Sequence, residues 1–351
     1  MKKAWCLIAV LALAACENEP GGGASDGGVQ VPDSGTPDAG GPDAGPGDGG
    51  QQEGEAGHWR ALSVPGVGTL NAVWGSGPRD VWAVGESGFI VHWDGEQWAQ
   101  ETRVPADFTF TLNDVWGSSA QDVWAVGAAG VILHFDGKAW QYVGFPEEPF
   151  CTLDICRGSL LALWGSSATD VWAVGRSDEA EGVVSHWDGT RWNHAVHAEV
   201  GRFESVWGSS ATDVWAGTLT RLLHWNGETW RERATGTSTF SVPLRLWGVA
   251  ANDVWGVNLA GEISHWDGVR WEEVALEGED VGPLRAISGT GAGQMWAVGG
   301  SGSSRTLLHW EEGMWKQVSL AAGPTLVDLW VLPDGEAWAV GLQGSLLHRV
   351  P

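Results

Sequence analysis

Tryptophan recurs along this chain at four positions of one repeated unit. The stretch LNAVWGSGPRDVWAVGESGFIVHWDGEQW carries them at Trp74, Trp82, Trp93 and Trp98, and the same frame returns up to the C-terminus. Every tryptophan of the chain except Trp5 falls in this frame. A sequence that repeats at ~40 residues is built from copies of one supersecondary unit. The repeat therefore constrains the fold more tightly than length or composition does.

Each unit contains four short segments rich in β-branched and aromatic residues. They follow the patterns L-x-x-V-W, D-V-W-A-V, x-I-x-H-W and W-x-x-x-x, and Gly, Ser, Asp and Asn separate them. These are the residue types of strands and turns, and no segment has a 3.6-residue apolar period long enough for a helix. We call the four tryptophan positions a, b, c and d in chain order. The sequence predicts an all-β protein whose unit is a four-stranded antiparallel sheet.

The number of units and the order of their segments predict a closed ring. Four-stranded units repeated radially form a β-propeller. Position b holds tryptophan in every unit, at Trp82, Trp124, Trp172, Trp215, Trp255, Trp296 and Trp338. A d segment around Trp59 precedes the first a segment, and the last unit stops near Arg349 without a d segment of its own. We therefore expect a seven-bladed β-propeller, closed by pairing residues 58–64 with the strand near Arg349, which removes two exposed sheet edges.

The first residues have the layout of an export signal. Two lysines precede an apolar run of ~12 residues, too short to span a bilayer, and LAAC follows at residues 13–16. This tetrapeptide resembles a bacterial lipobox, and the resemblance implies that Cys16 is lipidated and becomes the new N-terminus. With Glu17 next, it also implies an outer-membrane lipoprotein, on the periplasmic side or at the cell surface. The alternative is an ordinary signal peptide in which Cys16 is incidental.

Residues 16–57 consist mainly of Gly, Pro, Asp and Ala with almost no apolar bulk. Such a segment cannot bury enough apolar surface to offset the entropy of ordering, so we expect a disordered tether. The predicted organisation is a lipoprotein signal peptide at residues 1–15, a tether at 16–57 and a propeller at 58–351.

The formal net charge is −25. A strongly acidic surface repels phosphate backbones, which argues against a nucleic-acid partner and leaves the lipid as the only membrane attachment. The acidity is also explained by solubility alone. We expect a monomer.

Cys151 and Cys156 lie close together in PFCTLDICRGS. In an exported protein such a pair is expected to form a small-loop disulfide, and the alternative is two free thiols. A metal site would need further ligands, and no other Cys or His lies within a few residues.

Histidine recurs once per unit, directly before position c. The residues are His92, His134, His186, His224, His265, His309 and His348. The third strand of a blade lies well out from the axis, so these residues should be too far apart to share an ion with ligand bonds of ~2 Å. We interpret them as packing and hydrogen-bonding residues between blades, and we expect no metal and no cofactor. Asp residues two before position b, such as Asp80, are expected to bond nearby backbone amides.

The chain carries no familiar catalytic motif. It has no G-x-S-x-G, no H-E-x-x-H and no phosphate loop. Its one tyrosine, Tyr142, and its scattered arginines do not make a sialidase-type site. We therefore expect no catalytic residue and no enzyme activity. A glycan-active hydrolase or lyase is the one enzymatic hypothesis, and it stands third behind the two binding hypotheses given below.

The unit V-W-A-V-G-x-x-G-x-I-x-H-W-D-G-x-x-W resembles two families of propeller repeat. Val81–Val84, Gly88–Ile90 and Gly95–Trp98 are similar to the tectonin repeat. The unit also resembles the BNR (Asp-box) and photosystem II assembly-factor repeats, although Asp94 and Gly95 are adjacent and His92 takes the place of the hydroxyl residue. The tectonin resemblance implies glycan binding, and the assembly-factor resemblance implies protein binding.

Irregularities of the repeat indicate which face binds. The a–b interval is the same in every unit, as from Trp74 to Trp82, and the c–d interval is equally constant, so insertions fall in the b–c and d–a loops. Variable loops on a rigid scaffold commonly carry binding sites. Candidate contacts on this b–c/d–a face are Phe108, Phe110, Phe145, Phe150, Arg176, Phe203, Phe240 and Arg305. The alternative is that each phenylalanine packs within its own loop.

The sequence thus predicts a non-catalytic binding module displayed on a lipid-anchored tether. One hypothesis has it recognise glycans at the cell surface, and the other makes it a protein-binding scaffold or assembly lipoprotein.

Overall fold

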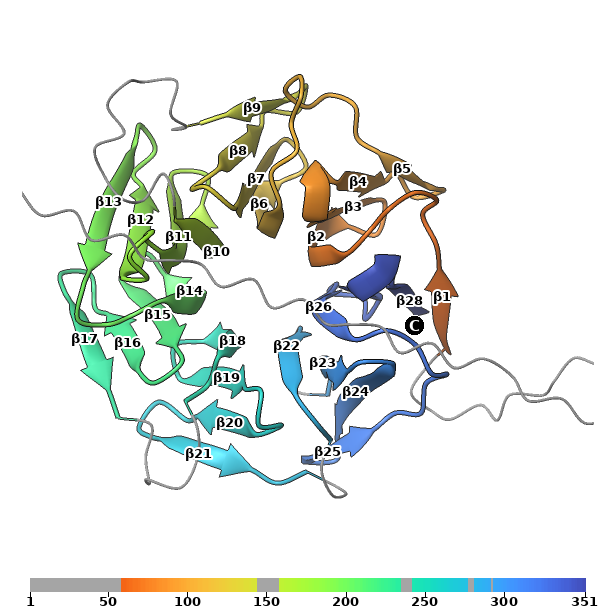
Figure 1. Cartoon of the computed structure of the whole chain (residues 1–351). Coiled ribbons are helices and arrows are strands. Elements are labelled where there is room, and N and C mark those ends of the chain that lie inside the picture. The colour runs from red at the N-terminus through yellow and green to blue at the C-terminus, as the bar shows by residue number, and fades with distance from the viewer. Residues whose placement is uncertain (1–57, 144–157, 235–241, 277–280, 292) are drawn as a thin grey trace, which may run out of the picture. The chain divides into compact units, whose positions relative to one another are not determined.

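The computed structural model describes residues 58–143, 158–234, 242–276, 281–291 and 293–351. The expectations for the signal peptide, the tether, Cys16, Cys151, Cys156, Phe145, Phe150 and Phe240 lie outside these residues. Within them the chain is nearly all β and forms a ring of seven four-stranded sheets (Figure 1). The expected fold class is confirmed.

The strands occupy four concentric positions. The innermost strands, which carry position a, are β2 (Leu70–Gly77), β6 (Leu112–Ser119), β10 (Ser159–Ser167), β14 (Phe203–Ser210), β18 (Arg245–Ala250), β22 (Leu284–Gly289) and β26 (Leu326–Val331). The second strands carry position b and are β3 (Asp80–Gly85), β7 (Asp122–Gly127), β11 (Asp170–Arg176), β15 (Asp213–Thr218), β19 (Asp253–Val257), β23 (Met295–Ser301) and β27 (Ala337–Gly341).

The third strands carry position c and the outermost strands position d. The third strands are β4 (Ile90–Trp93), β8 (Ile132–Phe135), β12 (Gly182–Trp187), β16 (Leu222–Trp225), β20 (Ile263–Trp266), β24 (Ser304–Glu311) and β28 (Leu346–Val350). The outermost are β5 (Trp98–Gln100), β9 (Trp140–Tyr142), β13 (Trp192–His197), β17 (Trp230–Arg233), β21 (Trp271–Val274), β25 (Met314–Gln317) and β1 (His58–Leu62). Short 3-10 turns η1 (Glu86–Gly88) and η3 (Leu342–Gly344) follow two of the second strands.

The seventh blade joins the two ends of the described chain. Its strand order is β1-β28-β27-β26, and β1 pairs antiparallel with β28 from His58 opposite Val350 to Leu62 opposite Leu346. The predicted ring closure is confirmed, and the closing strand ends at Leu62. Both backbone edges that an open ring would expose are thereby paired.

The b-position tryptophans form the contacts between blades. Trp124 is 2% exposed, stacks on His134 of its own blade, and meets Trp187 and Trp192 of the next blade with ring centroids 5.2 and 5.4 Å apart. The same arrangement recurs around the ring. At the closure Trp296 meets Trp59, and Arg349 stands in for the c-position ring by placing its guanidinium 5.2 Å from the Trp296 centroid. The b-position tryptophans are therefore core residues between blades.

In six of the seven blades the repeated histidine hydrogen-bonds a carboxylate of its own blade, and not a residue of the neighbouring blade as the sequence predicts. In blade 1 the Nε2 atom of His92 lies 2.6 Å from an oxygen of Asp80, and Ser76 donates to the other oxygen at 2.5 Å. The His92 ring also stacks on Trp82 with centroids 4.0 Å apart. The aspartates thus bind side chains of their own blade, whereas the sequence predicts nearby backbone amides as their partners.

These networks predict a loss of stability in acid. Burial raises the pKa of Asp170, but hydrogen bonds from His186 and Ser166 outweigh it and hold that pKa below its ordinary value of 3.8. A lowered pKa in the folded state stabilises the fold above the ordinary value, and this contribution disappears as the pH falls through the folded value. We expect Asp170→Asn to cost about 1–2 kcal/mol at pH 7, and the cost to shrink as the pH falls below 3.8 toward the folded pKa. Urea titrations across that range measure it, and a cost independent of pH would contradict the assignment.

Candidate functional site

The two variable positions of L-x-x-V-W line a cavity on the axis of the ring. Because position a lies on the innermost strand, the residues before it face the axis. The cavity has a volume of about 430 Å³, and all seven innermost strands contribute to its wall. These positions hold different residues in different blades, among them Asp114, Glu204, Arg245, Arg285 and Asp328. Here the otherwise uniform repeat becomes irregular and charged.

A local break in strand pairing accompanies these positions in every blade except that of Arg245, whose strand β18 has no register shift at this point. The register between the first and second strands shifts between Leu70 and Ala72 in blade 1 and between Leu112 and Asp114 in blade 2. The extra residue is a β-bulge, which redirects side chains at the point where it occurs. In blade 1 it is Asn71, whose Nδ2 donates to the carbonyl of Leu112 at 2.8 Å. The bulges thus link neighbouring blades and turn polar groups toward the cavity.

Two aspartates of the wall accept hydrogen bonds from the next blade. The Oδ2 atom of Asp114 accepts from the amide of Leu163 at 2.7 Å, and Oδ2 of Asp328 accepts from the amide of Val73 at 2.8 Å. Burial raises the pKa of Asp114 to about 7 against the effect of the Leu163 and Val115 amides and of the charge of Arg245. Burial and the repulsion of Asp114 raise the pKa of Asp328 to about 8. Both carboxyls are therefore largely protonated in mildly acidic solution.

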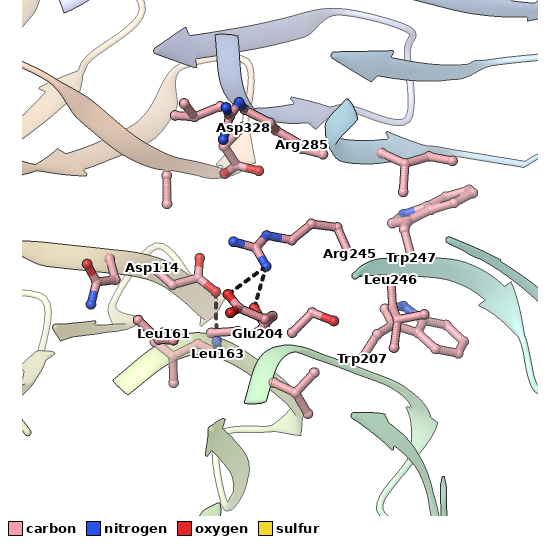
Figure 2. Close-up of a pocket in the computed structure, with 18 of the residues that line it drawn as sticks. Asp114, Leu161, Leu163, Glu204, Trp207, Arg245, Leu246, Trp247, Arg285 and Asp328 are labelled. Atoms are coloured by element: carbon pink, nitrogen blue, oxygen red, sulfur yellow. Dashed lines mark hydrogen bonds and ion pairs between the residues drawn. The ribbon is translucent and has the colours of Figure 1, made fainter. Parts of the chain in front are cut away.

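Arginines face these carboxyls from the other blades. Nη1 of Arg245 donates to the backbone oxygen of Glu204 at 2.7 Å and lies 3.6 Å from its carboxylate, and Arg202 also hydrogen-bonds that carboxylate. Figure 2 shows the Arg245 guanidinium reaching into the middle of the cavity, with Asp328 and Arg285 on one side and Asp114 and Glu204 on the other. The Nε atom of Arg285 is buried without a hydrogen-bond partner among the described residues.

The cavity reaches the b–c/d–a face of the ring. Arg202 and Leu244 come from d–a loops, and Leu219 and Leu259 come from the b–c loops of blades 4 and 5. Leu219 is 61% and Leu259 47% exposed, so the cavity opens beside apolar side chains. Farther in, the a-position tryptophans lie against the following blade. A Cβ added at Gly117 would fall 2.5 Å from the Trp74 ring, so glycine is required for this approach.

The raised pKa of Asp328 predicts a pH-dependent cost to folding. A carboxyl whose folded pKa lies above its unfolded value binds its proton more tightly when folded, so stability falls as the pH rises from about 4 to about 8. We expect Asp328→Asn to keep the acceptor for Val73 and to remove this loss, which can reach ~1.4 kcal/mol per pH unit. Denaturation between pH 5 and 9 tests it, and Asp334→Asn in an exposed turn is the control. Parallel curves for Asp328→Asn and the wild type would refute the shift.

The phenylalanines and arginines proposed from the sequence lie apart from one another, Phe108 and Phe110 in a loop and Phe203, Arg176 and Arg305 in strands. Phe203 is fully buried, Phe108 is 9% exposed and Phe110 is partly buried against the same cluster as Phe108. These three therefore take the packing role considered as the alternative. Arg176 ends β11, and Arg305 of β24 donates to the carbonyl of Ala322 at 3.1 Å. None of the five lines the axial cavity.

Other kinds of site find no support in the described residues. Within them no three His, Cys, Asp or Glu residues are grouped so as to hold a metal ion. In the same part of the chain no helix is long and apolar enough to cross a membrane.

Fold and cavity together define a seven-bladed β-propeller with a charged axial cavity. No protein-family model matches the sequence, and no curated protein sequence matches it significantly. Among solved structures it is similar to YCF48 bound to D1 peptide, with a TM-score of 0.63 and 18% identity over 84% of this chain and 97% of that one. It is also similar to the WD40 β-propeller domain of Doa1, with a TM-score of 0.66 and 14% identity over 84% and 97% of the two chains.

Virginiamycin B lyase from Staphylococcus aureus is a third such structure, with a TM-score of 0.67 and 11% identity over 84% of this chain and 99% of that one. At these identities the similarity is one of fold, and it includes a structure with a bound peptide as well as an enzyme. The tectonin and Asp-box resemblances stay predictions.

Proposed function

We propose that this protein is a non-catalytic binding module whose axial cavity receives a carboxylate of a partner protein. The observation that carries the proposal is the convergence of Arg202, Arg245 and Arg285 on one cavity of a strongly acidic chain. Guanidinium groups bind carboxylates through charge-assisted, bidentate hydrogen bonds. Glu204 engages two of the three arginines, whereas the buried Nε atom of Arg285 has no partner among the described residues.

The carboxyls of the wall adjust the charge of this site. With Asp114 and Asp328 protonated, three arginines face one carboxylate, and the cavity is positive. With both ionised, the formal charges balance. Since their pKa values are raised to about 7 and about 8, an anionic ligand should bind more tightly at pH 6 than at pH 9.

The mouth of the cavity favours a protein segment over a glycan. Exposed Leu219 and Leu259 flank it, and apolar side chains beside a charged pocket suit a peptide that carries both kinds of group. YCF48, a solved structure of the same fold, is bound to D1 peptide. A glycan bearing a carboxylate is the second candidate, because the same arginines would recognise its acid group.

Panning a random peptide library against the full chain at pH 6 tests the proposal. We expect selected peptides to carry Asp, Glu or an essential C-terminal carboxylate. Their affinity should fall about tenfold or more in Arg285→Ala and should fall again as the pH rises to 9. Arg270→Ala on an exposed c–d turn is the matched control.

The outcomes separate the candidates. Peptides without acidic groups that bind wild type and Arg285→Ala equally would overturn the carboxylate site. Failure to select any peptide, together with Arg285-dependent hits on an array of acidic glycans, would favour the glycan candidate.

We also propose that Cys16 carries lipid and holds the binding module at the outer membrane. The support is the LAAC tetrapeptide with its lysine-led apolar run. Mass spectrometry of the mature N-terminus and membrane release of Cys16→Ala test this, and an unmodified Cys16 would exclude it.

A further inference from the structure

A second recess lies on the outer side of the ring between blades 3 and 4. Blade 3 contributes His197 at the end of β13, and blade 4 contributes Arg221, Trp225, Trp230 and Glu232 from β16, β17 and the loop before them. Its volume is about 460 Å³, within the range of small-ligand sites. It shares no residue with the axial cavity, so what binds here does not depend on the function proposed above.

Two tryptophans form one wall of this recess. The rings of Trp225 and Trp230 have centroids 5.8 Å apart and are tilted by 45°, and both remain partly exposed. At the d position of blades 2, 5 and 6, by contrast, Trp140, Trp271 and Trp315 are at most 2% exposed. The core of blade 4 therefore leaves indole surface accessible at a place where those three blades cover it.

Blade 4 also carries a charged residue at a position where blades 2 and 3 carry an apolar one. Four residues before position c, blades 2 and 3 hold the fully buried Val131 and Val183, whereas blade 4 holds Arg221. Its guanidinium lies 3.5 Å from Glu232, with both side chains well exposed. Thr218 fixes the loop, because its Oγ1 accepts from the Arg221 amide at 2.9 Å and its own amide donates to the Arg221 carbonyl at 2.8 Å.

The charges of the recess do not select an ion. Arg221 and Glu232 compensate each other, and Glu228 adds one exposed negative charge, which disfavours an anion. Burial lowers the pKa of His197, so its imidazole is neutral at neutral pH. What the recess offers is an apolar aromatic wall beside a paired donor and acceptor. A neutral sugar ring matches this combination, because its C–H face packs on indole and its hydroxyls both donate and accept.

We propose that this recess, defined by Trp225, Trp230, Arg221 and Glu232, is a binding site for a neutral saccharide. The sugar ring packs on the tryptophan wall, and neighbouring hydroxyls bridge the Arg221 guanidinium and the Glu232 carboxylate. The site is present once in the ring because only blade 4 combines the arginine with the exposed tryptophans in the described residues.

Saturation-transfer NMR on the full chain tests the proposal. The probes are glucose, galactose, mannose, N-acetylglucosamine and their β-1,4-linked disaccharides. We expect at least one of them to receive saturation at its ring protons, and its affinity to fall about tenfold or more in Arg221→Ala and in Glu232→Gln. Glu273→Gln is the matched control, since Glu273 occupies the position of Glu232 in blade 5.

Arg285→Ala separates this site from the axial cavity. It should leave saccharide binding unchanged, whereas Arg221→Ala should leave peptide binding unchanged. Absence of saturation transfer to every probe would overturn the proposal, as would equal affinities of the wild type, Arg221→Ala and Glu232→Gln.

Discussion

Replacing Trp124 by alanine should lower the free energy of unfolding by ~3–5 kcal/mol. The indole is 2% exposed and lies between His134 of its own blade and the rings of Trp187 and Trp192 in the next. Its removal leaves a cavity at a blade interface, which neighbouring strands cannot fill without distorting their own sheets. Urea titration followed by circular dichroism measures the loss.

Two further variants make this result interpretable. Val269→Ala, at a side chain 81% exposed in a turn, should change stability by less than ~0.5 kcal/mol. Trp124→Phe keeps an aromatic ring and should lose less than alanine does. A loss below ~1 kcal/mol in Trp124→Ala would show that the b-position ring does not hold the blades together.

Deleting residues 58–62 should be the most damaging change at the ends of the described chain. It removes β1, leaves the backbone groups of β28 unpaired along one edge, and takes Trp59 from its contact with Trp296 at 5.3 Å. We expect the melting temperature to fall on the order of 10 °C. We also expect aggregation that increases with protein concentration, because an open edge strand pairs with other chains.

A deletion of equal length at residues 53–57 is the control, and it should leave the melting temperature unchanged. Trp59→Ala retains the backbone pairing and so separates the ring contact from the sheet edge. If the 58–62 deletion melts like the control, strand pairing between β1 and β28 does not stabilise the ring.

The repeat made the fold predictable because each of its positions has one structural task. Trp82 and its equivalents have to fill the gap between blades, so they recur without exception. Residues that replace tryptophan at position c keep its packing role. Phe135 and Arg349 each pack on the b-position tryptophan of the preceding blade.

The same reasoning explains why the axial cavity was missed. The insertions of the repeat predict a site in the long loops, but Phe108 in one such loop and Phe203 at the start of β14 pack in the core. The signal lay in the two variable positions of L-x-x-V-W, where asparagine, leucine, glutamate, arginine and aspartate alternate within an otherwise uniform strand. Once that strand is assigned to the inner wall of a ring, these are the variable positions that line the axial cavity.

The sequence alone determined the blade count, the order of strands and the ring closure, because local strand and turn preferences combine with an apolar pattern that recurs in every unit. Only the tertiary structure decided which charges meet. Asp114, Glu204, Arg245, Arg285 and Asp328 come from five blades, and their distances and the raised pKa values of the two aspartates depend on how the blades pack around the axis. Periodicity contains no such information, since it describes what the blades have in common.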